Sequence, residues 1–294
     1  MSPTNTVQID HQQLLAVAQG VEPLPANVAR LAQLVSDAES SMKEIVEVIS
    51  YDQALTATLL RRANAAALGG RQAISSVHDA AVRLGPGSLL AMALSTSVSK
   101  KMHRALPEYG LKEGQLWRNS VAAALSAETV RAASSVPVPP EVVTAALLHD
   151  FGKVVLANHF GPQVLDMLNA AALNDKLELV EAEQAIFGAT HADVGGIVAQ
   201  SWKLPGTIVD GIIHHHATRA GLPPICSAVA VAHLMAHDVV GEGCEEETPE
   251  GFADRVEAHT DVIVDLGIDP DRYPVLVADA RRRFEQLAVR FGLS

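Results

Sequence analysis

The chain has 294 residues, of which 48% are hydrophobic and 19% charged, a profile typical of globular proteins that bury a substantial core. Its net charge of -12 argues against binding to a nucleic-acid backbone, which requires a positive surface. Its 4% aromatic content also argues against a platform on which bases stack. Nucleic acid is therefore not expected as a partner.

The ends and the cysteines indicate a cytoplasmic protein. The N-terminal residues lack the basic start and apolar centre of a signal peptide, and no apolar run approaches the roughly 18–20 residues of a membrane span. Cys226 and Cys244 form no CxxC motif. We expect reduced thiols in a cytoplasmic location.

Apolar residues recur at helical spacing throughout the first half of the chain. Val28, Leu31 and Leu34, for example, fall on one face of a helix. The predicted helices cover residues 27–37, 41–52, 53–70, 76–85 and 87–102. They predict a helical lobe over residues 20–105, which follows an N-terminal helix or extension at residues 1–19.

Capping residues mark several of these helix ends. Ser40 and Ser41 are candidate N-caps, and Glu44 stands where a capping box needs its acid. Gly69 and Gly70 stop the third helix, and Gly85 is suited to a left-handed stop of the fourth.

The second half is also predicted to be helical. The expected helices cover residues 113–133, 139–160, 162–173, 179–188, 190–204, 205–216 and 226–240. We assign a second helical lobe to residues 106–240. The segment 241–252 is acidic and poor in apolar residues, so it is predicted to be an exposed linker, and an amphipathic helix over 274–291 completes a C-terminal region at 241–294.

The pair His149–Asp150 interrupts the apolar helix predicted over residues 139–160. A helix that is hydrophobic on all sides is usually buried, and a buried imidazole or carboxylate needs a partner. That partner is a metal ion, another side chain or the solvent of a cleft. The alternative to a metal site is a purely structural role, in which hydrogen bonds alone hold the two residues in the core.

Other histidines in the second half are candidate partners. His191 opens one predicted helix, His214, His215 and His216 end another, and His233 lies within a third. Histidine and carboxylate groups suit zinc, iron or manganese, and two-metal sites of such ligands activate water for attack on phosphoesters. Adjacent residues of a helix point about 100° apart, so at most two of the three consecutive histidines can face one centre.

The segment "LLHDFGKVVL" resembles the HD superfamily of metal-dependent phosphohydrolases, and more closely its HDOD branch, the HD-related output domain of bacterial signalling proteins. The likeness covers about residues 20–240. It also rests on the segments "LPANVARLAQLVSD", "IVEVISYDQALTATLLRRAN", "ISSVHDAAVRLG", "LWRNS", "THADVGGIVAQSWKLP" and "IIHHH". The resemblance implies an all-α fold, a two-lobed helical bundle whose second lobe is HD-like.

The resemblance also implies a set of site residues. The metal-binding pair matches His149 and Asp150, and the next histidine of dinuclear relatives matches His191. The family's His-His pair matches His215 and His216. In a hydrolase, Lys153 would contact the substrate phosphate.

Three departures from the family pattern argue against a typical hydrolase. Asn119 stands where metal-binding relatives have their first histidine, and His233 occupies the place of the closing aspartate. An asparagine carbonyl coordinates weakly, so a tight site of the usual ligand set is not expected. The absence of "GYP" after the histidines also argues against a cyclic di-GMP phosphodiesterase of the HD-GYP branch.

Two functional hypotheses follow. The first is a non-catalytic bacterial signalling module that binds a partner protein or a small nucleotide ligand through the cleft between its lobes, with no cofactor or with a divalent metal ion. The second is a metal-dependent phosphohydrolase of a nucleotide or cyclic dinucleotide, with Fe, Mn or Zn in the site. Residues 245–294 lie outside the resemblance and are a candidate surface for partner docking; the oligomeric state stays open.

Overall fold

The structure is a computed structural model that describes residues 16–17, 20–37, 39–65, 74–160, 179–241 and 249–291. Within these residues the regular secondary structure is helical, and the β-structure is limited to an isolated bridge between Leu106 and Leu111. The predicted all-α class is confirmed. None of the helices in this part of the chain combines the length and apolar character that a bilayer crossing needs.

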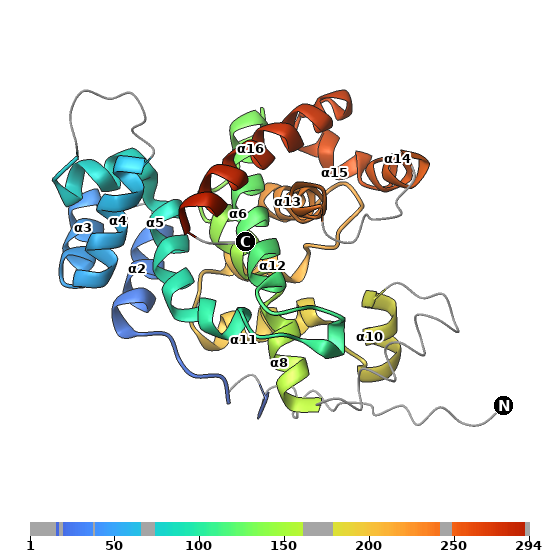
Figure 1. Ribbon diagram of the computed structural model, residues 1–294, viewed down its shortest axis with the longest axis horizontal. Coiled ribbons are helices and arrows are strands. Elements are labelled where there is room, and N and C mark those ends of the chain that lie inside the picture. Colours follow the sequence, from blue (N-terminus) through green and yellow to red (C-terminus); the bar gives the residue numbers. More distant parts are fainter. Residues whose placement is uncertain are drawn as a thin grey trace.

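The first lobe lies at one end of the molecule (Figure 1). Its helices are α2 (Ala26–Ser36), α3 (Met42–Ser50), α4 (Gln53–Ala65) and α5 (Val77–Met102). The Ser41 side chain accepts a hydrogen bond from the Glu44 amide, and the Glu44 carboxylate accepts one from the Ser41 amide. The predicted capping box therefore opens α3. The predicted stop at Gly69–Gly70 lies outside the described residues.

The long helix α5 contains the predicted break at Gly85. This residue has φ 76° and ψ 161° and is followed by Pro86, so the helix kinks where two helices were expected. Two residues later, a Cβ atom on Gly87 would lie 2.0 Å from the carbonyl oxygen of Pro140. The kink thus brings the second part of α5 against the backbone of the segment between α6 and α7 of the second lobe.

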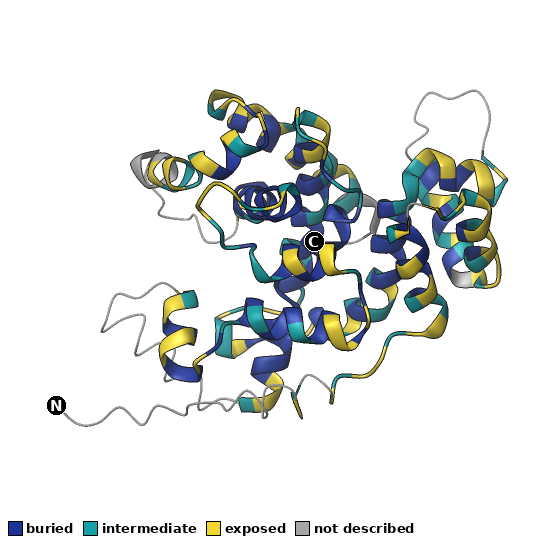
Figure 2. Cartoon of the chain, turned by 180° about the vertical axis from the view of Figure 1, so that it is seen from behind, coloured by how far each residue is buried: buried dark blue, intermediate teal, exposed yellow. Residues whose placement is uncertain are grey.

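The second lobe is built around two long helices that pack along each other, α6 (Gln115–Ala133) and α13 (Pro224–Val240). Most of its interior-facing residues are buried, as Figure 2 shows. Its other elements are η1 (Pro107–Tyr109), α7 (Val142–Leu148), α8 (Phe151–Phe160), α10 (Leu179–Phe187), α11 (His191–Ser201) and α12 (Gly206–Ile213). The helix expected at 162–173 lies outside the described residues.

The prediction of one continuous helix over 139–160 is wrong. The helix begins at Val142, and the chain is divided into α7 and α8 by a turn at His149 and Asp150. There the Lys153 amide donates to the Asp150 carbonyl oxygen, three residues back, at 3.1 Å. This tighter turn interrupts the helical hydrogen-bond ladder and places the His-Asp pair at a junction rather than within a helix.

The segment before α2 connects the lobes a second time. The Trp202 indole N–H donates to the carbonyl oxygen of Glu22 at 3.1 Å, and Lys101 of α5 donates to the Glu22 carboxylate at 3.1 Å. Glu22 therefore binds one residue of each lobe.

The C-terminal region packs on the second lobe. Its elements are α14 (Pro249–Ala258), α15 (Thr260–Asp265), η2 (Pro270–Arg272) and α16 (Tyr273–Phe291), and α16 runs along α6 and α13 (Figure 1). The predicted linker over 241–252 is too long, because α14 begins at Pro249, a residue suited to a helix start. Residues 245–294 were a candidate surface for partner docking, but one face of α16 is covered by the second lobe of the same chain.

Asp238 of α13 anchors this region. Its carboxylate accepts hydrogen bonds from the Tyr273 hydroxyl at 2.6 Å and the Arg255 guanidinium at 3.0 Å. Its backbone carbonyl accepts one from Arg281. One buried acid therefore binds α14 through Arg255, and it binds α16 at its first residue, Tyr273, and near its middle, at Arg281.

We expect Asp238→Asn to lower the free energy of unfolding by about 2 kcal/mol, since it leaves a tyrosine and an arginine facing a weaker acceptor. Urea denaturation measures the change. The control is Glu257→Gln, an exposed acid of α14. If both variants lie within about 0.5 kcal/mol of wild type, Asp238 is not an anchor.

Cys226 is fully buried in α13, and burial raises the pKa of its thiol to about 11, with Asp210 adding to the effect. Because the thiolate is the reactive form, iodoacetamide at about pH 8 is expected to leave Cys226 unmodified until the protein is denatured. Mass spectrometry of the tryptic peptides checks this; rapid labelling of the native chain would contradict it. Cys244 lies outside the described residues.

Candidate metal centre

Side chains from four parts of the second lobe converge on one buried cluster. They come from the junction between α7 and α8, the first residue of α11, the turn after α12 and the middle of α13. We call these residues the histidine cluster: His149, Asp150, His191, His215, His216 and His233. All six candidate ligands predicted from the sequence are therefore close together.

Four atoms form the inner part of the cluster. The Nε2 atom of His191 lies 3.2 Å from Nε2 of His215, 3.0 Å from Nε2 of His216 and 3.2 Å from Oδ1 of Asp150. The Asp150 oxygen is also 3.7 Å from Nε2 of His215. A second group adjoins it, in which Nε2 of His149 lies 3.0 Å from Nδ1 of His233 and 3.3 Å from Oδ2 of Asp150.

The outer nitrogen of three histidines is held by a hydrogen-bond acceptor. Nδ1 of His149 donates to the Ala146 carbonyl oxygen, and Nδ1 of His215 donates to the Ile212 carbonyl oxygen, both at 2.7 Å. Nδ1 of His191 lies 2.7 Å from the Glu183 carboxylate. A neutral imidazole that donates through Nδ1 has a lone pair on Nε2. The inner nitrogens of these three residues are therefore ligand atoms in the tautomer that metal sites use.

The cluster brings acceptors together without enough protons to satisfy them. Nε2 of His191, Nε2 of His215 and Oδ1 of Asp150 are mutually 3.2–3.7 Å apart, and Oδ1 is buried without a hydrogen-bond partner in the described part of the chain. A proton on His191 serves one of its neighbours at a time. A cation satisfies all three acceptors at once, and burial makes an unsatisfied acceptor costly.

Burial sets the charge states of these residues. It lowers the pKa of His215 and His233 well below the usual range, with neighbouring imidazoles adding to the shift, and it lowers the pKa of His216 to about 3. Burial opposes ionisation of Asp150 as well, but His149 and Lys153 outweigh it and hold the pKa of Asp150 well below its usual range. Burial lowers the pKa of His191, but Glu183 and Asp150 outweigh it and raise this pKa above its usual value. His215, His216 and His233 are thus neutral imidazoles of the kind that bind metal, whereas His191 has to release a proton when a metal binds.

The spacing also fits metal coordination. Two ligand atoms about 2.0–2.1 Å from a metal, at the angles of tetrahedral or octahedral sites, lie about 2.9–3.4 Å apart. Most of the inner distances fall in or near that range. Two sets of three imidazoles have their ligand atoms within 4.8 Å of one another, and both contain His215. One set is completed by His149 and His233, the other by His191 and His216.

The sequence pattern of the HDOD domain matches residues 21–218. The chain belongs to the HDOD domain family. A protein of Treponema pallidum is 24% identical over 240 residues, which are 79% of this chain and 45% of that protein, so this chain spans about half the length of its curated relative.

Solved structures share the HDOD fold. An HDOD domain protein from Geobacter sulfurreducens has a TM-score of 0.70 and 24% identity, with 97% of this chain and 99% of that chain covered. A protein from Shewanella amazonensis SB2B, described as a candidate phosphohydrolase, has a TM-score of 0.67 and 24% identity, with 94% and 98% of the two chains covered.

Lys153 lies beside the cluster of this HDOD protein but is already engaged. Its ammonium group donates to Oδ2 of Asp150 at 2.8 Å, and the residue is 8% exposed. Lys153 thus binds the carboxylate of Asp150, and the predicted contact between Lys153 and a substrate phosphate stays a prediction.

Asn119 and His214 take no part in the contacts that define the histidine cluster. Asn119 lies on α6, and its Oδ1 atom is buried without a hydrogen-bond partner in the described residues. His214 turns away and binds the carbonyl oxygen of Asp210 through Nδ1 at 2.9 Å. Two of the three consecutive histidines face the centre, as expected, but they lie in the turn after α12 and not on the helix predicted over residues 205–216.

Three neighbours of the HDOD cluster were missed in the sequence. Glu183 accepts from both the backbone amide and Nδ1 of His191, and its other oxygen accepts from the Tyr109 hydroxyl at 2.8 Å. The ring of His237 lies edge-on to that of His233, one helical turn away, with 4.9 Å between the ring centroids. His237 follows His233 by four residues and so falls on the same face of α13, which could have identified it from the sequence. Nothing in the sequence around Glu183 indicates that it is fully buried.

Proposed function

We propose that this HDOD protein is a bacterial signal-transduction module whose second lobe holds a divalent transition-metal ion without turning over a substrate. The observation that carries the proposal is the set of three buried groups on His191, His215 and Asp150, whose inner atoms lie 3.2–3.7 Å from one another, so that one cation could contact all three.

The surroundings of the cluster favour a structural metal over a catalytic one. Catalytic metal sites keep an open coordination position for water or substrate, whereas structural sites are closed. His191 and His215 are 0% exposed, and Asp150 is 3% exposed and bound by Lys153. Such an ion would tie α11 and the turns after α7 and α12 together and so keep the HD-like lobe rigid.

The donor set favours some metals. An imidazole-rich site with one carboxylate suits zinc or iron better than manganese, which prefers oxygen ligands. The inner atoms of His191, His215, His216 and Asp150 would hold the ion, with Glu183 as the outer partner of His191.

A metal-dependent phosphohydrolase is the second candidate, and one observation favours it. A cavity of about 450 Å³ adjoins the cluster at His216 and is lined by Thr218 and Arg219, both exposed. An arginine there would bind a phosphate through paired hydrogen bonds. The related Shewanella amazonensis protein is described as a candidate phosphohydrolase, which agrees with this alternative.

Elemental analysis of protein purified without a histidine tag tests the proposal. We expect close to one Zn or Fe per chain, reduced to background in His191→Ala, while His78→Ala, which removes an exposed imidazole of α5, retains it. Background metal in the wild-type chain, even after addition of Zn or Fe and desalting, would overturn the proposal.

The same preparations separate the two candidates. Incubation with bis(p-nitrophenyl) phosphate and cyclic di-GMP, with Zn, Fe or Mn added, should release no product above the metal-only background. Release that disappears in both His191→Ala and Arg219→Gln would instead establish the hydrolase.

A further inference from the structure

A cavity of about 290 Å³ lies between the two lobes, away from the histidine cluster. Helices α4 and α5 supply one side of it, and α6, α7 and α16 supply the other. Its volume is near the lower end of the about 300–1,000 Å³ typical of ligand pockets. The cavity is therefore large enough for a small organic molecule.

Most of the wall is apolar. Met92 of α5, Leu125 of α6, Leu147 of α7 and Leu287 of α16 contribute to it. The rings of Trp117 and His103 also line it, with their centroids 5.5 Å apart and their planes 31° from parallel. A flat or aliphatic body has matching surface here, and an apolar lining with a few polar groups is the usual composition of such sites.

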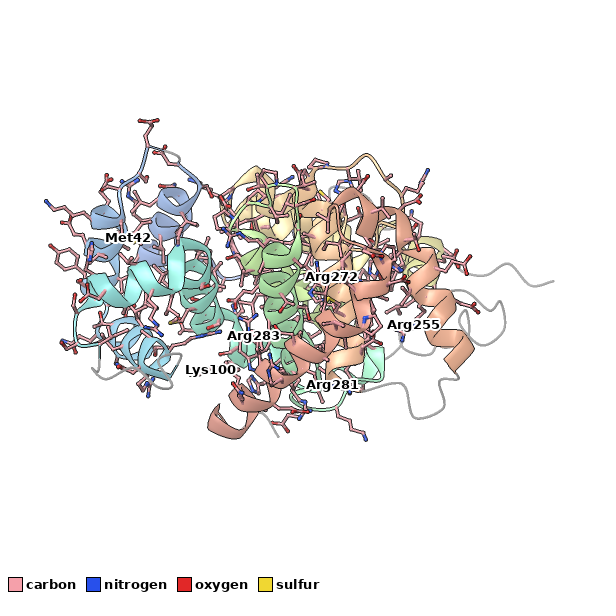
Figure 3. The ribbon with its side chains drawn as sticks, turned by 90° about the horizontal axis from the view of Figure 1, so that it is seen from above. Met42, Lys100, Arg255, Arg272, Arg281 and Arg283 are labelled. Carbon is pink, nitrogen blue, oxygen red and sulfur yellow. The ribbon has the colours of Figure 1, made fainter. Side chains whose placement is uncertain are left out.

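Two charged groups, Glu128 and Arg62, lie on the wall. Each carboxylate oxygen of Glu128 accepts one hydrogen bond, Oε1 from Ser88 at 3.1 Å and Oε2 from Arg283, which also binds Thr129 at 3.0 Å. Figure 3 labels Arg283 beside α6, where α16 approaches the first lobe. Arg62 also faces the cavity but makes no hydrogen bond or ion pair with any described residue.

The local charge balance therefore favours an anion. Glu128 is paired with Arg283, so Arg62 adds a positive charge to the wall that no carboxylate of the described residues binds, in a chain whose net charge is -12. Burial lowers the pKa of Arg62, partly opposed by Glu128, as expected for a guanidinium that has lost some of its water. Such a group binds a carboxylate more strongly than an exposed arginine does.

We infer that the cavity between the lobes binds a small apolar carboxylate, with its acid group on Arg62 and its body toward Trp117. The ligand would contact both lobes, so its binding would couple their positions. That signalling role rests on the proposed function, whereas the binding itself requires no metal.

Fluorescence of Trp117 tests the inference directly. In Trp202→Phe, which removes the indole that packs on Phe151 outside the cavity, the remaining tryptophan reports on the site. Sodium octanoate is the probe, and octan-1-ol and octylammonium are the controls for its charge. We expect a saturable change with octanoate, about tenfold weaker binding of octan-1-ol, and the weakest binding of octylammonium.

A matched pair of arginine variants locates the acid group. Arg62→Gln is expected to weaken octanoate binding about tenfold, whereas Arg61→Gln, which changes an exposed neighbour bonded to Thr58, leaves it unchanged. Calorimetry on the chain with both tryptophans replaces fluorescence if Trp202→Phe fails to fold. No saturable binding up to about 10 mM, or equal affinities in the two arginine variants, would overturn the inference.

A metal-free variant separates this inference from the proposed function. Octanoate binding is expected to persist in His191→Ala, provided that the variant is folded by circular dichroism. Persistence with no metal in any preparation would overturn the proposed function alone; loss of binding in folded His191→Ala would overturn the claim that the site is independent of the metal.

Discussion

Replacement of Gly152 by alanine is expected to lower the free energy of unfolding by about 3 kcal/mol. A Cβ atom at this position would lie 1.9 Å from the carbonyl oxygen of His191 and 2.9 Å from the backbone nitrogen of Gly195. These are backbone atoms of α11, so relief requires α8 and α11 to separate. Urea denaturation followed by circular dichroism measures the loss.

The control for this variant is Gly206→Ala. Gly206 is the first residue of α12, and a Cβ atom there would meet nothing within 4 Å. We expect no loss of stability, because alanine at a compatible helical position is neutral or slightly favourable. A Gly152→Ala variant as stable as this control would show that α8 and α11 are not in close contact.

Removal of metal is expected to lower the melting temperature of the wild-type chain by about 10 °C. A ligand that binds only the folded state at about 1,000 times its Kd stabilises it by about 4 kcal/mol, and about 2–4 °C corresponds to each kcal/mol for a chain of this size. Scanning calorimetry with and without EDTA measures the shift.

His215→Ala is expected to make the melting temperature insensitive to EDTA. His215 belongs to both sets of three imidazoles, so its removal disrupts either arrangement of the ion. An equal EDTA shift in wild type and in His215→Ala would place the metal elsewhere, and no shift in wild type would contradict a stabilising ion.

The sequence contained enough information to predict the helices and most of the histidine cluster. Apolar residues at helical spacing locate α2, α3, α6 and α13, because each of these helices buries one or more faces in the core. His149 and Asp150 were predicted because a polar residue within an apolar run must have a buried partner. His191, His215 and His216 were predicted from the resemblance to the family.

What could not be predicted depends on contacts between distant segments. The turn at His149 and Asp150 is invisible in the apolar pattern, which continues from α7 into α8 without a change of period. The burial of Glu183 depends on Tyr109 and His191, which lie 74 and 8 residues away. A glutamate in an amphipathic helix is usually solvated, so its role becomes clear only from the tertiary structure.

Several contacts hold the first lobe against the second. Glu22 holds the segment before α2 to Trp202, Gly87 packs against Pro140 after the kink in α5, and α5 packs along α7. These contacts involve different elements of the second lobe, so the loss of any one of them does not free the first lobe. Any opening between the lobes therefore has to separate α5 from α7 as well as release Glu22 from Trp202.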